Sequence, residues 1–174
     1  MKYVLLMICG LLMYTGGQAK TDTLKTVDSV NLLKYAGKWY EIASKPIHWQ
    51  RNCDCSSAEY TPRSDGKIDV LNSCNDRKKL KRDSTRAVAW PTDATNAKLK
   101  VKFGLITGDY QIIALAPDYS YAMVGTGDRK YLWILSRTRI MDEAIIKDLV
   151  ATAEKLGFVV EDLQFTKQSC YNNY

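Results

Sequence analysis

The stretch GKWYEIAS, from Gly37 to Ser44, places a tryptophan two residues after a glycine and then reads as an extended segment. Successive side chains of a β-strand point to opposite faces, so the stretch has two faces. One carries Trp39, Glu41 and Ala43, and the other carries Tyr40, Ile42 and Ser44. Glycine has no side chain, so the backbone at Gly37 can approach a large neighbour closely. The stretch therefore predicts a first strand that packs an aromatic ring near the backbone.

Seven further segments between residues 55 and 136 alternate apolar and polar residues and are separated by turn-forming residues, as expected of half-buried strands. They cover residues 55–61, 67–73, 85–90, 97–103, 109–116, 121–126 and 130–136. The connections are short, and the sequence Ser64-Asp65-Gly66 is typical of a tight hairpin. Sequential strands joined this way favour a closed up-and-down barrel over a sandwich, which would need crossing connections.

The pattern changes to helical spacing in residues 141–158. One helical face carries Ile146, Leu149, Val150, Ala153 and Leu156. Asp142 and Glu143 favour the start of this helix and Gly157 its end, and a short strand is expected at 163–167. The predicted fold is all-β: an eight-stranded up-and-down antiparallel β-barrel with one C-terminal α-helix packed outside and a short final strand. A barrel of eight strands can hold one small ligand.

Residues 1–19 read as a signal peptide: Lys2, an apolar run, and small residues at Gly17 and Ala19. The run is shorter than the roughly 20 residues of a membrane-spanning helix. We therefore expect an exported protein, periplasmic or secreted, with residues 20–174 as one domain. Bulky Ile8 precedes Cys9, so a lipid anchor at Cys9 is not expected, although association with an outer membrane stays open.

Four cysteines remain after residue 19, and an even number in an exported chain indicates two disulfides with three pairings open. They are Cys53, Cys55, Cys74 and Cys170. The first three together with His48 also have the ligand types of a zinc site. An oxidising compartment favours the disulfides over such a site.

Catalysis finds little support, because the chain has one histidine and neither a nucleophile elbow nor a phosphate-binding loop. The chain is therefore not expected to be an enzyme or to need a cofactor. Two alternatives stay open: a barrel enzyme, either an isomerase or one acting through the thiol of Cys53 or Cys55, and haem or metal binding through His48. The basic run at 76–86 is interpreted as a solvated loop or as a cationic rim for an anionic membrane surface. Export disfavours nucleic acid as a partner.

Three motifs in order resemble those of the lipocalin family: GKWYEIAS, APDYSYAMVG, and YLWILSRT ending in Arg137. The likeness is closest to bacterial outer-membrane lipocalins and to apolipoprotein D. It implies a set of structural motif residues: Gly37, Trp39, Asp118, Tyr121 and Arg137. In this family the tryptophan packs at the closed end of the barrel with the arginine across its ring. That cation–π pair would contribute about 0.5 to 2 kcal/mol.

The resemblance also implies disulfides Cys55–Cys170 and Cys53–Cys74, and it implies pocket positions Tyr60, Asn72 and Trp133. Trp49 and Trp90 are further candidates at the mouth of the barrel. The expected function is that of an exported bacterial lipocalin. It would bind a small hydrophobic ligand, a fatty acid or lysophospholipid, and store or transport it in membrane maintenance.

Overall fold

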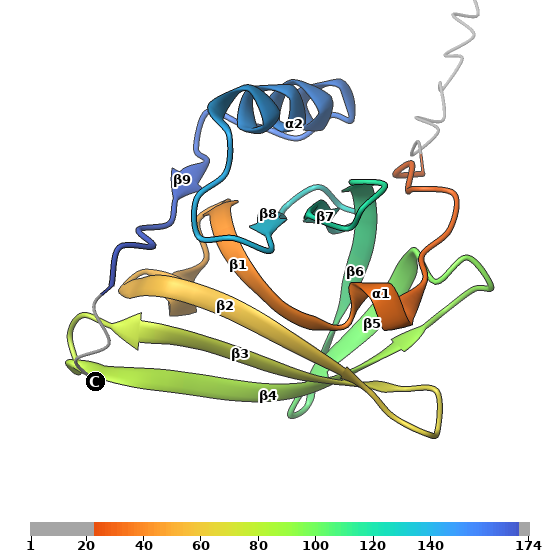
Figure 1. Ribbon diagram of the computed structural model, residues 1–174, viewed down its shortest axis with the longest axis horizontal. Helices are drawn as coiled ribbons and strands as arrows, with labels where there is room; N and C mark the ends of the chain where they lie inside the picture. The colour runs from red at the N-terminus through yellow and green to blue at the C-terminus, as the bar shows by residue number, and fades with distance from the viewer. Residues whose placement is uncertain (1–22, 171–174) are drawn as a thin grey trace, which may run out of the picture.

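The computed structural model describes residues 23–170, in which eight antiparallel strands form a closed barrel (Figure 1). The strands are β1 (Gly37–Ser44), β2 (Cys53–Pro62), β3 (Ile68–Asp76), β4 (Lys81–Pro91), β5 (Lys98–Phe103), β6 (Ile106–Leu115), β7 (Tyr121–Gly125) and β8 (Leu132–Ser136). Each pairs with the next in the chain, and β1 pairs with both β8 and β2, which closes the ring. The predicted up-and-down barrel is confirmed.

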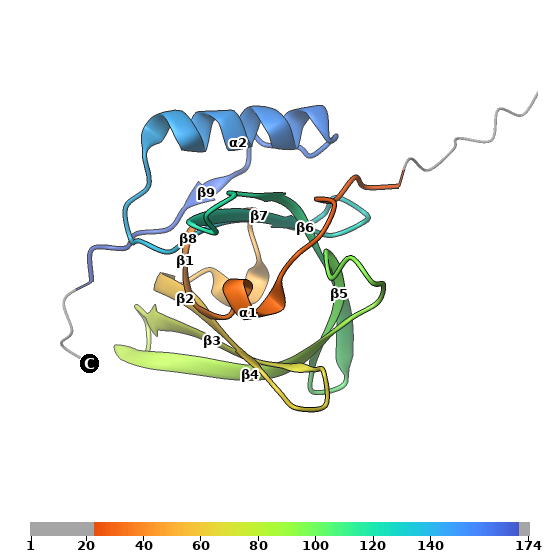
Figure 2. The same cartoon turned by 45° about the vertical axis from the view of Figure 1, so that its right-hand side comes forward.

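The two ends of the barrel are built differently. A short helix, α1 (Leu32–Tyr35), begins at Asn31, whose side chain accepts hydrogen bonds from two backbone N–H groups. Figure 2 shows α1 lying across one end of the ring of strands, here called the floor. The other end, the mouth, carries the β1–β2 connection with the 3₁₀ turn η1 (His48–Gln50). The sequence pattern predicted neither element, because each is too short to show a period.

Helix α2 (Glu143–Lys155) packs on the outside of the barrel, as predicted (Figure 1). Asp142 caps its first turn by accepting a hydrogen bond from the N–H of Ala144 at 2.7 Å. The outer apolar cluster between helix and strands includes Leu132, Ile134 and Leu149. No helix among residues 23–170 has the length and apolar character needed to cross a membrane.

A β-bulge in β1 interrupts the simple alternation of side chains that its sequence predicts. The ladder with β8 shifts register between Glu41 and Ala43. Glu41 lies opposite Leu135, which packs in the interior cluster, whereas Ala43 belongs to the outer cluster. Ser44 consequently lies opposite Trp133. The two predicted faces of this strand hold up to Ile42, which packs in the outer cluster as expected, and the extra residue exchanges the faces from Ala43 onward.

The basic run predicted as a loop is partly strand. The turn between β3 and β4 covers residues 77–80, and the Asp76 carboxylate accepts hydrogen bonds from the N–H groups of Lys78 and Lys79. Because this turn is short, the β3–β4 ladder begins directly beside it, with Asp76 opposite Lys81. The cations therefore lie along a protruding hairpin rather than in an irregular loop.

A ninth strand lies between β1 and β2 at the mouth. β1 and β2 pair only over Gly37–Tyr40, and beyond this point β9 (Gln164–Phe165) pairs with β1. On its other side, the N–H of Cys55 donates to the carbonyl of Lys167 at 2.7 Å. Residues 164–168, here called the seam segment, thus fill the gap where β1 and β2 separate.

Two disulfides bond the mouth region, with the pairings that the family resemblance implied. Cys55–Cys170 ties β2 to the chain two residues after the seam segment, and Cys53–Cys74 crosses the β2–β3 ladder. The predicted signal peptide, residues 1–19, lies outside the described residues, and so does Cys9.

Candidate functional site

The floor of the barrel is plugged by Trp39. Its side chain is fully buried, and its indole N–H donates to the carbonyl of Tyr35 at 2.8 Å. The guanidinium carbon of Arg137 lies 3.8 Å from the centre of the Trp39 ring, and its N–H groups donate to the carbonyls of Lys34 and Lys38. Gly37 has a φ of +88°, and a Cβ there would lie 3.6 Å from Arg137. Trp39 and Arg137 therefore close this end of the barrel, with Trp39 fully buried and Arg137 partly exposed on the outer side of the floor.

Above the plug, three tyrosines form a chain of hydrogen-bonded hydroxyls. Tyr110 contacts Tyr35 at 2.7 Å and Tyr60 at 2.8 Å. Burial raises the pKa of Tyr60 to about 12 and raises those of Tyr35 and Tyr110 as well, so all three stay neutral at physiological pH. The cavity beside them leaves about 10 Å³ for the centre of a water-sized molecule, which is room for roughly one water. This part of the interior is almost completely packed.

Side chains in the mouth half of the interior are less completely buried. Trp133 packs against the interior cluster, and its ring stacks on Tyr131 with centroids 6.0 Å apart. Asn72 lies opposite Ala58 and follows the inward-facing Ile68 and Val70 by steps of two. Asn72 and Trp133 both point inward yet are only partly buried.

The structure places the two remaining tryptophan candidates less favourably. Trp90 follows the inward-facing Ala87 and Ala89 by an odd number of residues, so it points outward. It lies at the end of β4 near the floor, opposite Lys100 on β5. The expectation that Trp90 lies at the mouth is wrong, because Trp90 lies at the end of β4 that is far from the β3–β4 turn. The two-residue period of the strand also turns its side chain outward. Trp49 belongs to η1 at the mouth, but its side chain is outside the described part of the structure.

Sequence analysis missed one polar group in the barrel wall, the carboxylate of Glu41. Only 7% of this residue is exposed. One carboxylate oxygen accepts hydrogen bonds from Thr166 at 2.6 Å and Ser44 at 3.3 Å, and the other accepts one from the Gln50 amide at 3.3 Å. Burial raises the pKa of Glu41, and these hydrogen bonds offset part of the rise. An acidic residue at an inward position of an apolar strand was the available signal.

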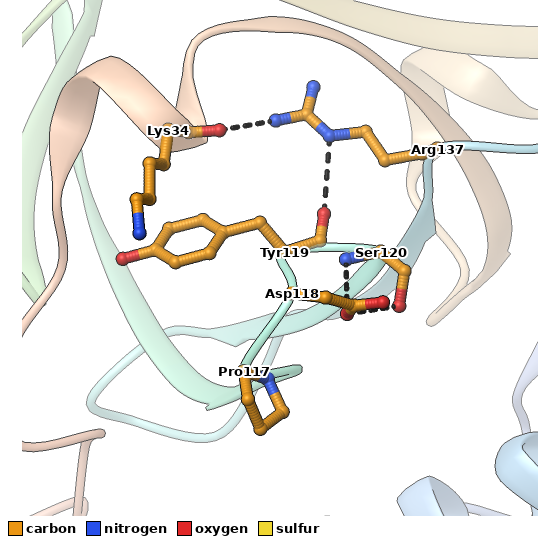
Figure 3. A pocket seen from close by; sticks show the side chains of 6 residues that line it. All are labelled: Lys34, Pro117, Asp118, Tyr119, Ser120 and Arg137. Atoms are coloured by element: carbon orange, nitrogen blue, oxygen red, sulfur yellow. Dashed lines mark hydrogen bonds between the residues drawn. The ribbon is translucent and has the colours of Figure 1, made fainter.

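A surface hollow of about 450 Å³ lies outside the barrel at the floor (Figure 3). The residues that line it are Lys34, Pro117, Asp118, Tyr119, Ser120 and Arg137. Hydrogen bonds within the chain engage its polar groups: Asp118 accepts two from Ser120, and Arg137 donates to the carbonyl of Tyr119. The hollow marks the β6–β7 turn, and Tyr121 begins β7 directly after it. Of the motif residues, Asp118 therefore stabilises the β6–β7 turn, and Tyr121 is the first residue of the strand that follows.

The sulfurs of the four cysteines within residues 23–170 are bonded in disulfides, and His48 is exposed. Among residues 23–170, no group of three or more His, Cys, Asp and Glu side chains is arranged to hold a metal ion.

Comparisons with known proteins agree with this architecture. The model of the lipocalin-like domain family matches residues 30–168. Temperature-induced lipocalin-1 of Arabidopsis thaliana is 40% identical over 157 residues, covering 84% of this chain and 83% of its own length. Outer membrane lipoprotein Blc of Citrobacter freundii is 38% identical over 144 residues, covering 82% of this chain and 81% of its own length. The structure of insecticyanin from the tobacco hornworm Manduca sexta matches with a TM-score of 0.67 at 21% identity, and the match covers 83% of this chain and 84% of the insecticyanin chain.

Proposed function

The chain belongs to the lipocalin family, and from this membership we propose that it is a carrier that holds one single-chain lipid, a fatty acid or lysophospholipid, in the mouth half of its barrel. The observation that carries the proposal is the apolar inner wall with partly buried Trp133 and Asn72 above a packed floor. Lipocalins bind small hydrophobic ligands, and the relatives named above are lipocalins and lipoproteins.

The affinity would come from burial of the acyl chain. Each methylene moved out of water contributes about 0.8 kcal/mol, so ten methylenes would contribute roughly 8 kcal/mol before the costs of ordering and association. The tight packing around Tyr60 and Tyr110 limits how deep such a chain can reach unless side chains move. We infer a ligand whose polar end stays near the mouth.

We also propose that the protein is exported, acts without catalysis, and stores or transports lipid in membrane maintenance. The predicted signal peptide and the pairing of the four cysteines that follow it support export, since disulfides persist in oxidising compartments. Paired sulfurs also leave no thiolate to serve as a nucleophile. The Blc relatives are named outer membrane lipoproteins, so the state of Cys9 decides between a free and an anchored protein.

Contact with an anionic membrane surface is the second part of the proposal, and the β3–β4 hairpin supports it. Lys79 of this hairpin pairs with Asp76 and Asp83. Lys78, Lys81 and Arg86 are exposed and form no ion pair within residues 23–170. Unpaired cations near a membrane surface attract anionic headgroups by about 1 kcal/mol each.

The test of the carrier function is titration of the purified, disulfide-bonded protein with a fluorescent fatty acid, together with native mass spectrometry of protein isolated from its own host. We expect saturable binding of one equivalent and a co-purified lipid. If the titration shows no saturable binding and no lipid co-purifies with the protein, the proposal is wrong. Sedimentation with vesicles containing or lacking anionic lipid tests the membrane contact, and replacing Lys78, Lys81 and Arg86 by glutamine should abolish the difference.

A further inference from the structure

The inner wall at the mouth contains a group of buried oxygen atoms that lack partners. Among residues 23–170, four buried side-chain polar atoms have none. Three of them belong to residues that hydrogen bonds link to Glu41, directly for Gln50 and Gln168 and through Gln168 for Ser56: Oε1 of Gln50, Oγ of Ser56 and Oε1 of Gln168. Buried polar atoms normally have a hydrogen-bond partner, so their concentration in one place is informative.

Glu41 joins three segments of the chain, of which the seam segment is distant from the other two. It lies on β1, Gln50 belongs to η1 above the mouth, and Thr166 belongs to the seam segment. The amide N–H groups of Gln168 donate to the carbonyls of Glu41 at 2.8 Å and Ser56 at 2.9 Å, which fixes the seam segment to both neighbouring strands. These residues therefore form one continuous polar wall, here called the Glu41 wall: Glu41, Ser44, Gln50, Ser56, Thr166 and Gln168.

The two β1 members of the Glu41 wall, Glu41 and Ser44, face the barrel interior. Glu41 lies opposite Leu135 of the interior cluster and two residues after the inward-facing Trp39. Ser44, which donates to Glu41, lies opposite Trp133. Directly opposite residues in a ladder have Cβ atoms about 5 Å apart. The wall and the Trp133 ring are thus neighbours on the inner surface.

The chemistry of the wall is almost entirely that of an acceptor. The donors that reach the carboxylate are two hydroxyls and one amide, all uncharged, and two of these three bonds are long at 3.3 Å. The unpaired amide oxygens of Gln50 and Gln168 are acceptors as well. What complements such a wall is a hydrogen-bond donor, whereas a second carboxylate would be repelled.

We propose that the Glu41 wall recognises the head group of the carried lipid and selects a hydrogen-bond donor, an ammonium or a hydroxyl group, over a carboxylate. The inference rests on the proposed carrier function and narrows its ligand class. An ammonium group fits on two counts: the carboxylate supplies the opposite charge, and the neighbouring indole of Trp133 offers an aromatic face to a cation. The acyl chain would then extend from the wall along the apolar interior.

The test uses three probes with the same twelve-carbon chain: dodecylamine, dodecanol and dodecanoate, each displacing a fluorescent fatty acid from the protein. We expect dodecylamine to bind about tenfold more tightly than dodecanoate, since a charge-assisted hydrogen bond replaces a repulsion. Dodecanol distinguishes the two donors: affinity equal to that of the amine assigns the site to hydroxyl groups, and weaker affinity assigns it to ammonium. Either result supports the proposal.

Glu41→Gln keeps the shape of the side chain and removes its charge, so the preference for amine over acid should fall below about threefold. Glu59→Gln is the matched control, because Glu59 is an exposed acid on the adjacent strand and its loss should change nothing. Gln50→Leu provides a second variant should Glu41→Gln fold poorly, and it should weaken amine binding alone.

Three outcomes distinguish a failure of head-group selection by the Glu41 wall from a failure of the carrier function. If dodecanoate binds as tightly as dodecylamine in the unchanged protein, head-group selection is wrong while the carrier function stands. If the preference survives in Glu41→Gln, the wall is not its source. If none of the three probes displaces the fluorescent fatty acid and that acid itself does not saturate, the carrier function fails first.

Discussion

Truncation of two tryptophans should separate the stability of the barrel from its ligand binding. Trp39→Ala removes a fully buried ring, its hydrogen bond to Tyr35 and its contact with the Arg137 guanidinium. Deletion of a packed aromatic side chain costs about 3 to 5 kcal/mol. The lost cation–π contact adds about 1 kcal/mol. The expected loss of about 4 to 6 kcal/mol is a large part of the 5 to 15 kcal/mol typical of a folded domain.

Trp133→Ala should behave in the opposite way. Its ring is only partly buried in the mouth half of the interior, where water or ligand can occupy the space left behind. We therefore expect a loss of about 1 to 2 kcal/mol in stability, below that of a fully packed aromatic. Affinity for a fluorescent fatty acid should fall about tenfold, since the acyl chain loses an aromatic contact.

Urea unfolding followed by far-ultraviolet circular dichroism measures the first effect, because that signal does not depend on the deleted fluorophore. With a slope of about 2 kcal/mol per molar urea, the Trp39→Ala midpoint should fall by about 2 to 3 M and the Trp133→Ala midpoint by less than about 1 M. Trp39→Phe is the control that keeps most of the ring but loses the indole N–H. Equal losses of stability and affinity in the two alanine variants would show that the assignment of floor and mouth is wrong.

Four further outcomes are expected. Intact-mass measurement of the exported protein should show the first nineteen residues removed and no acyl group on Cys9; a mature chain that begins at a lipidated Cys9 would contradict this. Gly37→Ala should lower the free energy of unfolding by about 1 to 2 kcal/mol in urea titration, since φ there is +88°; an unchanged midpoint would show that the backbone relaxes. Replacing Cys55 and Cys170 together by serine should cost up to about 4 to 5 kcal/mol, because that bridge closes a loop of 115 residues, and a loss under about 1 kcal/mol would refute the entropic reasoning. Burial raises the pKa of Glu41 in the folded state above 4.5, so the folded protein binds the carboxyl proton more tightly than the unfolded chain does. The resulting stabilisation is full below pH 4.5 and is lost as the pH rises through the folded pKa. Glu41→Gln should flatten this part of the profile of unfolding free energy against pH, and an unchanged slope would assign the pH dependence to other groups.

The strands and the outer helix could be predicted because their signals are local and repeated. Alternation in β8 separates Trp133 from Leu132 and Ile134, and the structure places the latter two toward the helix. Short connections limited the topology to sequential neighbours, which is what the ring of pairings shows. The same reasoning, applied to the period of β4, would have placed Trp90 outside.

Features that depend on one residue or on distant segments were not predictable in this way. The bulge after Glu41 exchanges the faces of Ala43 and Ser44 without leaving a signature in the local sequence. The Glu41 wall joins residues more than a hundred positions apart, such as Glu41 and Thr166. Alternation alone cannot show which polar side chains meet across a barrel.

The seam segment also makes the closure of the barrel depend on residues outside its eight strands. It follows all eight strands in the chain, and apart from it β1 and β2 are joined only over Gly37–Tyr40. Without the segment, one side of the mouth would be a slot between two strand edges. The bond between Cys55 and Cys170 holds the stretch of chain that covers this slot. Reduction of that one disulfide would therefore loosen the wall of the barrel itself.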